Sequence, residues 1–398
     1  MQRRADVPTL GSLGPSARAV VRALLLAGPL SRAELARRLE RSPASLTKIT
    51  QPLLASGLVR EESATATVSE KAPSESRGRP GAPLVLRASR HLFVGVKVTA
   101  DELYAVRADA SGRVEASVHR VLEDRDPATV VAQIVELVKE LGSPGPIQAL
   151  GIGLAGQMSR FDRTVRANAY LGWDQVPLAQ LLEEATGIPT VVSEDARALT
   201  AGVQWSGPGR GMSDFAVLTV GVGVGLGIVL EDRVLAGPTG KVGRIGHTRV
   251  SDSGPLCSHG HRGCASAFLT TRAITQGIGV PHGRTDVDLD AAYGLAEAGD
   301  EVALRVFADA GHALGVLIAQ LVNMLGLPAV ILAGDGLGML AHARPAMEAA
   351  IAEHLDPNAT APTVVAFTSG FDEWARGAAV VACQWMLVDP PTRHPEPA

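Results

Sequence analysis

Residues 15–57 carry three short helical patterns; each has its own start signal, and the first and third also have a stop signal. The start signals are side chains that cap a helix or a proline at its first position, and the stop signals are glycines. In chain order the starts are Ser16, Ser31 with Glu34, and Ser42 with Pro43, and the stops are Gly28 and Gly57. Short helices around a tight turn, followed by the extended residues 58–60, predict an all-α, winged helix-turn-helix domain over residues 1–62.

The third helix is the one predicted to read DNA bases. Its outward-facing residues combine short polar side chains with a cation, which suits base edges and phosphates in a major groove. They are Ser42, Ala44, Ser45, Thr47, Lys48 and Gln51. The alternative is a small helical module that docks another protein.

Charge separates this N-terminal part from the rest of the chain. Residues 1–90 hold 15 Lys and Arg against 7 Asp and Glu, a net charge of +8, and the remainder carries −12. A basic segment on an acidic remainder indicates a polyanionic partner for that segment alone. Residues 63–83 are predicted to form a wing tip and linker, from which Arg77 and Arg79 would enter a minor groove.

Strand and helix patterns alternate from residue 84 to the C-terminus. Examples are the strands 92–98 and 149–154 and the helices 127–141 and 301–325. Such alternation predicts α/β lobes in which helices cover sheets. Apolar runs fall short of the roughly 18 residues of a membrane span, and no export signal is evident, so a cytoplasmic protein without a membrane partner is expected.

A cluster of histidines and cysteines predicts a metal site. Its members are His247, Cys257, His259 and Cys264. Thiolates and imidazoles separated by turn-forming residues can close a tetrahedral Zn²⁺ site, and four protein ligands would make the zinc structural. The alternative is a hydrogen-bonded core histidine beside ordinary buried cysteines. His261 is a spare candidate ligand.

Two further features admit two interpretations each. The glycine run 221–227 lies between predicted strands, which favours a tight hairpin, although it would also let a phosphate approach closely. Asp195 follows the predicted strand 190–193, where a general base would stand; an exposed loop carboxylate is the alternative.

Several motifs, in this order, resemble the ROK family (repressors, uncharacterised reading frames and sugar kinases), specifically its regulator branch. They are Gly78-Arg79-Pro80, Leu171-Gly172-Trp173 followed by Val176-Pro177-Leu178, Gly187-Ile188-Pro189 with Glu194-Asp195-Ala196, Gly246-His247, the Cys/His cluster with Gly260 and Gly263, and Asn323 to Gly334. The resemblance implies an actin-like, two-lobed body with ribonuclease H-like α/β lobes over residues 84–398. It also implies a sugar cleft, a zinc site beside it, and a homodimer or homotetramer. His259 stands where the family usually has a cysteine.

The same resemblance implies that kinase chemistry is lost. Family kinases place an Asp-x-Gly-Gly-Thr loop at the first strand, whereas this chain has residues 97–101, Lys-Val-Thr-Ala-Asp. The leading carboxylate has become a cation, and side chains replace the glycines that admit phosphate. The second loop, residues 221–223, lacks the family's hydroxyl. The expectation is therefore a protein that is not an enzyme, with Asp195 a vestigial base.

Candidate effector residues follow from the family's sugar-binding positions. Four depart from the family pattern: Tyr170 and Glu194 replace asparagines, and Arg244 and Ser266 replace glutamates. With Asp195 and His247 they form the candidate site. Arg244 would pair with Asp195, or bind a phosphorylated or acidic sugar; alternatively the cleft binds nothing tightly.

The resulting prediction is a DNA-binding regulator, expected to be a repressor, that acts as a homo-oligomer on a palindromic double-stranded operator. A sugar or sugar-phosphate effector would change the spacing of the DNA-binding heads. The rivals are a ROK-type sugar kinase and a regulator controlled by a protein partner.

Overall fold

The computed structural model describes residues 10–62, 82–158, 163–236, 242–368 and 370–388. The chain divides into two compact units. Unit 1 comprises residues 1–211 and 374–398, and unit 2 comprises residues 212–373. The predicted N-terminal domain lies within unit 1.

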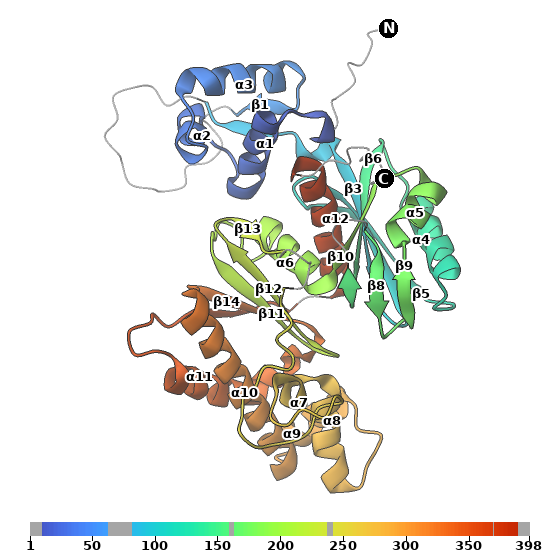
Figure 1. Ribbon diagram of the computed structural model, residues 1–398, viewed down its shortest axis with the longest axis vertical. Helices are drawn as coiled ribbons and strands as arrows, with labels where there is room; N and C mark the ends of the chain where they lie inside the picture. Colours follow the sequence, from blue (N-terminus) through green and yellow to red (C-terminus); the bar gives the residue numbers. More distant parts are fainter. Residues whose placement is uncertain (1–9, 63–81, 159–162, 237–241, 369, 389–398) are drawn as a thin grey trace, which may run out of the picture. The chain divides into compact units, whose positions relative to one another are not determined.

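The N-terminal part, called the head below, contains a helix-turn-helix (Figure 1). Its elements are η1 (Leu10–Ser12), α1 (Pro15–Ala27), α2 (Arg32–Arg38), α3 (Pro43–Ala55) and β1 (Val59–Glu61). Ser31 caps α2 through the predicted capping box with Glu34, and Ser42 caps α3. The predicted cap Ser16 is wrong, because α1 starts one residue earlier at Pro15 and its N-cap is Gly14.

Strand β2 (Leu84–Leu86) pairs antiparallel with β1, with Arg60 opposite Val85. It also bonds to the turn after α1, where Leu30 and Leu84 form a bridge. The sequence predicted that the body begins at residue 84, directly after the linker. Residues 84–86 nevertheless form hydrogen bonds with the head, so they belong to the two-stranded sheet of the head.

The first sheet of the body has the order β10-β6-β3-β4-β5. Its strands are β3 (Leu92–Val98), β4 (Glu102–Asp109), β5 (Val114–Val121), β6 (Ile147–Leu154) and β10 (Thr190–Glu194). Strands β3, β6 and β10 are parallel, so their carboxyl ends meet at one edge. A small antiparallel sheet is formed by β7 (Gln157–Met158), β8 (Val165–Asn168) and β9 (Trp173–Val176).

Helices cover both faces of the first sheet. Helices α4 (Pro127–Leu141) and α5 (Leu178–Thr186) join Val94, Val96 and Ile152 in one core. The opposite face receives α6 (Asp195–Ser206) and α12 (Phe371–Val388), where Gly95 of β3 and Gly151 and Gly153 of β6 allow close approach. A Cβ at Gly95 or Gly151 would overlap the backbone of α12.

Unit 2 is built on a second sheet of order β13-β12-β11-β14-β15. Its strands are β11 (Phe215–Val220), β12 (Val224–Leu230), β13 (Arg233–Val234), β14 (Ala329–Ala333) and β15 (Thr363–Ala366). Its helices are α7 (Ala265–Leu269), α8 (Thr271–Gly279), α9 (Leu289–Glu297), α10 (Glu301–Leu325) and α11 (Leu340–His354), with short turns η3 (Val280–His282) and η4 (Asp335–Met339). The two sheets with their helices confirm the predicted α/β body.

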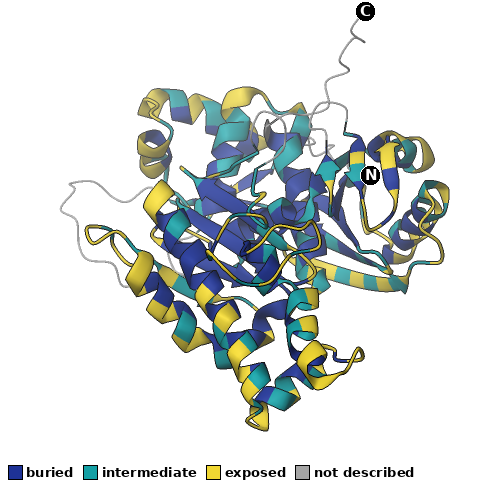
Figure 2. Cartoon of the chain, turned by 60° about the horizontal axis from the view of Figure 1, so that its bottom comes forward, coloured by how far each residue is buried: buried dark blue, intermediate teal, exposed yellow. Residues whose placement is uncertain are grey.

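Helix α10 has the length and apolar composition of a membrane span. It was predicted as a helix with the same bounds, Glu301–Leu325. Its apolar side chains, among them Phe307, Leu314 and Leu321, lie in the core of unit 2. The burial colours show this distribution, with buried strands and helices that are exposed on one side only (Figure 2). Burial in the core accounts for the composition of α10.

Candidate functional site

Helix α3, which the sequence predicts to read DNA bases, presents a polar face. Leu46, Thr50 and Leu53 are buried, while Ser42, Ala44, Thr47, Lys48 and Gln51 are exposed and Ser45 is half-buried. Two hydroxyls serve the helix itself, since Thr47 Oγ1 donates to the Pro43 carbonyl (3.0 Å) and Thr50 Oγ1 to that of Leu46 (2.8 Å). Lys48 and Gln51 are therefore the long polar side chains that this face offers to a partner. The predicted minor-groove residues Arg77 and Arg79 lie outside the described residues.

In unit 1, a lysine and an aspartate meet at the carboxyl edge of the first sheet. Lys97 on β3 lies in register with Gly153 on β6, which in turn is opposite Ser193 on β10. Because Gly153 has no side chain, the lysine can extend across β6 towards the strand beyond. Its Nζ lies 2.5 Å from Asp195 Oδ2, with the side chains 6% and 18% exposed.

Asp195 is the first residue of α6, and its Oδ1 accepts the N–H of Ala196 (2.8 Å). A carboxylate at a helix N-terminus is stabilised by the exposed N–H groups there. Lys97 Nζ also lies 5.0 Å from the ring centroid of Trp374, in α12. The Asp195 carboxylate is thus held by a cation and by its own helix, so it already has a partner without Arg244.

Tyr170 follows β8 and is 45% exposed. Burial raises the pKa of its phenol, and the negative charge of Asp195 raises it further, which places Tyr170 in the electrostatic field of that carboxylate. Asn168 orders the turn before it by accepting the N–H groups of Tyr170 (2.9 Å) and Leu171 (3.0 Å). Glu194 occupies the N-cap position of α6, next to Asp195, without a capping hydrogen bond from its side chain. These three predicted effector residues, Tyr170, Glu194 and Asp195, belong to unit 1.

The other three predicted effector residues belong to unit 2. Arg244 and His247 are exposed, and Ser266 is half-buried. Ser266 donates its N–H to the Gly246 carbonyl (2.6 Å), and a Cβ at Gly246 would stand 2.7 Å from Ser266 Oγ. The serine therefore packs directly against the residue before His247.

The cysteine and histidine cluster gathers as a candidate metal centre in unit 2. His247 Nδ1 lies 3.7 Å from Cys257 Sγ and 3.7 Å from Cys264 Sγ. The four side chains whose ligand atoms all lie within 4.8 Å of one another are His247, Cys257, His261 and Cys264. Three of the predicted ligands meet, and the spare candidate His261 takes the fourth place instead of His259.

A tight turn explains this exchange. Gly260 has a left-handed φ of +80°, the Cys257 N–H donates to the His261 carbonyl (2.9 Å), and Leu256 pairs with Arg262. Residues 257 and 261 therefore face each other across the turn, whereas His259 sits at its tip with Nδ1 3.2 Å from Ser258 Oγ. The spacing of His259 and His261 in the sequence does not reveal which of the two histidines faces the other three ligands.

The donor set fits Zn²⁺. Two sulfurs and two nitrogens at Zn–S of about 2.3 Å and Zn–N of about 2.0 Å stand roughly 3.3–3.8 Å apart in a tetrahedron, close to the 3.7 Å separations here. Burial lowers the pKa of His247, and the neighbouring His261 and His259 lower it further, so the neutral imidazole that metals require is favoured. Burial raises the pKa of the Cys257 thiol, but N–H groups of His259 and His261 outweigh burial and lower it overall.

The glycine run forms the hairpin favoured by the sequence. Strands β11 and β12 pair up to Val220 and Val224, and Gly221 donates its N–H to Gly223 (3.1 Å). A carboxylate covers this turn, because a Cβ at Gly221 would overlap Oδ1 of Asp335. A negatively charged side chain therefore lies in contact with this glycine turn.

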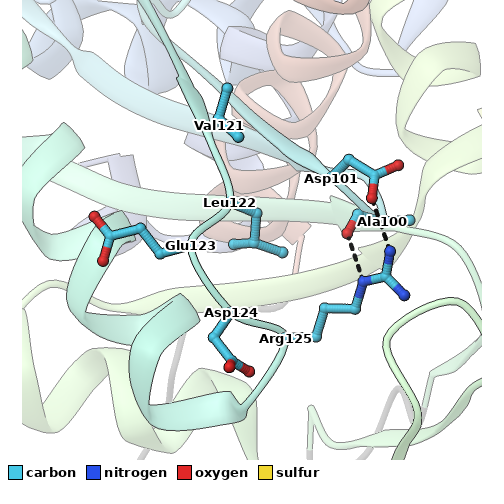
Figure 3. Close-up of a pocket in the computed structure, with 7 residues that line it drawn as sticks. All are labelled: Ala100, Asp101, Val121, Leu122, Glu123, Asp124 and Arg125. Atoms are coloured by element: carbon cyan, nitrogen blue, oxygen red, sulfur yellow. Dashed lines mark hydrogen bonds and ion pairs between the residues drawn. The ribbon is translucent and has the colours of Figure 1, made fainter.

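An open pocket lies beside the turn between β3 and β4 in unit 1 (Figure 3). Its lining is Ala100, Asp101, Val121, Leu122, Glu123, Asp124 and Arg125. Arg125 spans it, donating to the Ala100 carbonyl (2.9 Å) and pairing with Asp101 (2.7 Å). The pocket contains none of the predicted effector residues.

Three residues of these sites were not assigned to them from the sequence: Lys97 as the partner of Asp195, Trp374 and Asp335. Lys97 carried a usable signal, since it is the single charge in the apolar strand 92–98 and a buried lysine requires an anion. Trp374 and Asp335 carried none, because their partners lie far away in the sequence.

Two bacterial repressors are similar to this chain over most of its length. The xylose repressor of Caldicellulosiruptor bescii is 24% identical over 326 residues, covering 77% of this chain and 79% of its own. The DNA-binding transcriptional repressor Mlc of Escherichia coli K12 is 25% identical over 341 residues, covering 82% of each chain.

Two solved structures share the fold. A ROK family transcriptional regulator, a homologue of the E. coli Mlc protein, has a TM-score of 0.78 at 23% identity and covers 94% of this chain and 96% of its own. The ROK hexokinase of Thermus thermophilus has a TM-score of 0.64 at 26% identity, covering 73% of this chain and 97% of its own. The hexokinase therefore aligns with only part of the chain, whereas the regulator spans nearly all of it.

The family model described as "ROK family" matches residues 93–384. This segment includes both sheets, Lys97 and Asp195, and the candidate metal centre. The chain belongs to the ROK family.

Proposed function

We propose that this protein is a transcription repressor that binds operator DNA through its head. The observation that carries the proposal is the polar face of α3, on which Lys48 and Gln51 extend from a helix fixed by buried Leu46, Thr50 and Leu53. A helix held on its apolar side and polar on the other can enter a major groove. The repressor names of the xylose repressor and Mlc support the same function. Arg77 and Arg79 remain proposed minor-groove contacts.

The effector is proposed to be a sugar or a sugar derivative, including a sugar phosphate. The name of the C. bescii relative points to this ligand class. The polar groups proposed to contact the effector are Tyr170, Glu194 and Asp195 in unit 1. In unit 2 they are Arg244, His247 and Ser266. A sugar recognises such groups through hydroxyls that both donate and accept hydrogen bonds.

No kinase activity is expected. Phosphoryl transfer needs a free general base and loops that admit phosphate. Here Lys97 occupies the Asp195 carboxylate at 2.5 Å, and the Asp335 carboxylate lies against Gly221. ATP turnover above background with any hexose or N-acetyl sugar would support the rival sugar kinase.

The metal centre is proposed to hold structural Zn²⁺ through His247, Cys257, His261 and Cys264, with His259 the alternative fourth ligand. Zinc bound there would tie the segment that carries His247 to the loop that carries the cysteines. Four protein ligands leave no open position for water, so its role would be to stabilise the fold.

The protein is proposed to act in the cytoplasm as a homodimer or homotetramer. A symmetric protein with two heads matches a palindromic operator, whose half-sites lie on one side of the duplex one or more helical turns apart. Analytical ultracentrifugation of the full chain, alone and with DNA, would distinguish the two assemblies.

The test of the function is genome-wide mapping of sites bound by the full-length protein, followed by titration of a recovered site. We expect saturable binding that is at least about 1,000-fold tighter than to scrambled DNA of equal length. Equal affinity for both DNAs would contradict a sequence-specific regulator. If specific binding is found and is relieved by a co-purifying protein instead of sugars, the partner-controlled alternative holds.

A further inference from the structure

We propose that the Lys97–Asp195 ion pair controls DNA binding, because one continuous set of contacts inside unit 1 connects it to the head. This inference rests on the proposed function and adds its regulation. The pair as described here corresponds to the DNA-binding form. A ligand hydroxyl that donates to Asp195 would compete with the Lys97 ammonium for the same carboxylate and would weaken the head's attachment.

The pair fixes the first turn of α6. Asp195 begins this helix, and its two oxygens are divided between Lys97 Nζ (2.5 Å) and the N–H of Ala196 (2.8 Å). Nine residues of α6, from Ala196 to Trp205, are buried, so the helix cannot move without its neighbours. One close contact is with α12, where a Cβ at Gly377 would overlap the Ala198 carbonyl oxygen.

Lys97 contacts both α6 and α12, the two helices that cover one face of the first sheet. Lys97 Nζ lies 5.0 Å from the ring centroid of Trp374 in α12, and 2.5 Å from the carboxylate that begins α6. Its release would therefore loosen the start of α12 and the start of α6 together. A close-packed interior transmits such a change as movement of whole elements.

The far end of α6 lies against the head. Helix α1 packs on α6, and after the helix ends the Arg210 guanidinium comes within 3.6 Å of a Cβ position at Gly28, the C-cap of α1. The sheet makes a second connection, since Gln148 at the start of β6 accepts the N–H of Leu10 (3.2 Å) and bonds to His91 (2.5 Å). Strands β3 and β6 thus begin near the head and end at Val98 and Leu154, beside the ion pair.

The test uses hydrogen–deuterium exchange of the full-length protein, read separately at residues 15–27 and 199–210. Three variants are compared: Lys97→Met, Asp195→Asn, and the two combined. We expect at least tenfold faster exchange at both segments in all three, and at least tenfold weaker operator binding. Lys97→Arg should retain both properties, and Lys139→Met, which changes an exposed lysine of α4, serves as the matched control.

The double variant separates this proposal from simple destabilisation. Each single variant leaves one buried charge unpaired, whereas the double variant leaves none. If the double variant regains wild-type exchange and operator affinity, the unpaired charge was the cause and the proposal is overturned. Unchanged exchange at residues 15–27 in every variant overturns it as well. Because exchange is read without DNA, a wild-type protein that fails to bind DNA would refute the proposed function and leave this test intact.

Discussion

Single residues decide which chemistry the body retains. Lys97 stands in a strand that is otherwise wholly apolar, and its ammonium is neutralised by Asp195 at 2.5 Å. A general base must be free to accept a proton, and a carboxylate paired with a buried cation is not. Lys97 therefore leaves the Asp195 carboxylate paired with a cation, and this pairing is the basis of the proposal that the protein lacks kinase activity.

The fourth zinc ligand is a prediction at the same scale. Replacing His261 with Ala should lower bound zinc well below one per chain, because a tetrahedral site loses one of its four ligands. His259→Ala is the matched control two residues away and should keep stoichiometric zinc. Elemental analysis after dialysis against a mild chelator measures both. Zinc loss in His259→Ala with retention in His261→Ala would reverse the assignment.

His91 gives a pH dependence of stability. Burial lowers its pKa from 6.5 to about 4, and the hydrogen bond with Gln148 opposes the shift only in part. Between these values the unfolded chain binds more protons than the native state, so stability falls as pH decreases from 6.5 to 4. Above pH 6.5 the contribution is complete, and by about pH 4 roughly 2–3 kcal/mol is lost.

Chemical unfolding of wild type and His91→Gln at several pH values measures this effect. The glutamine does not titrate, so the difference in unfolding free energy between the two proteins should shrink as the pH falls from 7 to 4. A difference that stays constant over this range would contradict a depressed pKa at His91. Carboxylates that titrate in the same range affect both proteins equally and cancel.

Among the elements, the head helices were the most predictable. Their caps and stops are local, since Ser31 and Glu34 satisfy each other three residues apart and Gly28 ends α1 with φ +83°. The core side of α3 includes a polar residue. Thr50 is fully buried, whereas Ile49 and Leu54 are half-buried; the threonine can enter an apolar core because its hydroxyl donates to the Leu46 carbonyl.

Helices α6 and α12 were not predicted, and packing explains why. A helix buried on nearly every side has no polar stripe, so its sequence lacks the 3.6-residue alternation that identifies a surface helix. Most of α6 is buried, and α12 contains runs such as Ala378 to Ala382 that are buried throughout. Strands β7 and β13 have two residues each, too few to show any period.

The seating of α12 on the sheet gives a prediction at this scale. A Cβ at Gly151 would overlap the Ala378 carbonyl oxygen, so Gly151→Ala must separate β6 from α12. We expect a loss of about 3 kcal/mol in unfolding free energy, the upper range for overpacking a core. Gly145→Ala is the control, because no atom lies within 4 Å of its Cβ position. Equal stabilities of the two variants in urea would contradict this contact.

On the scale of the whole molecule, charge and function are distributed unequally. Residues 1–90 carry +8 and the rest of the chain −12, so attraction to DNA is concentrated in the head while the body is repelled. This distribution favours an approach to DNA with the head first.

Salt dependence tests this distribution. Operator affinity should fall steeply with salt, and Lys48→Ala should reduce the slope of log K against log salt by about 0.9, the value for one lost phosphate contact. Lys139→Ala, an exposed lysine on α4 of the body, should leave the slope unchanged. Equal slopes for the two variants would place Lys48 away from the phosphates. The measurement is fluorescence anisotropy between 50 and 300 mM salt.

The sequence by itself determined the capping of α2 and α3 in the head, the alternation of strands and helices in the body, and the residues that stand where the family's phosphate loop is expected. These features depend on neighbours a few residues apart, where periodicity and capping act. Only the tertiary structure decided that Lys97 pairs with Asp195, that His261 turns towards His247, and that α6 connects the ion pair to the head. Each of these three contacts brings together groups whose distance depends on strand register or on the geometry of a turn. The spacing of residues along the sequence specifies neither.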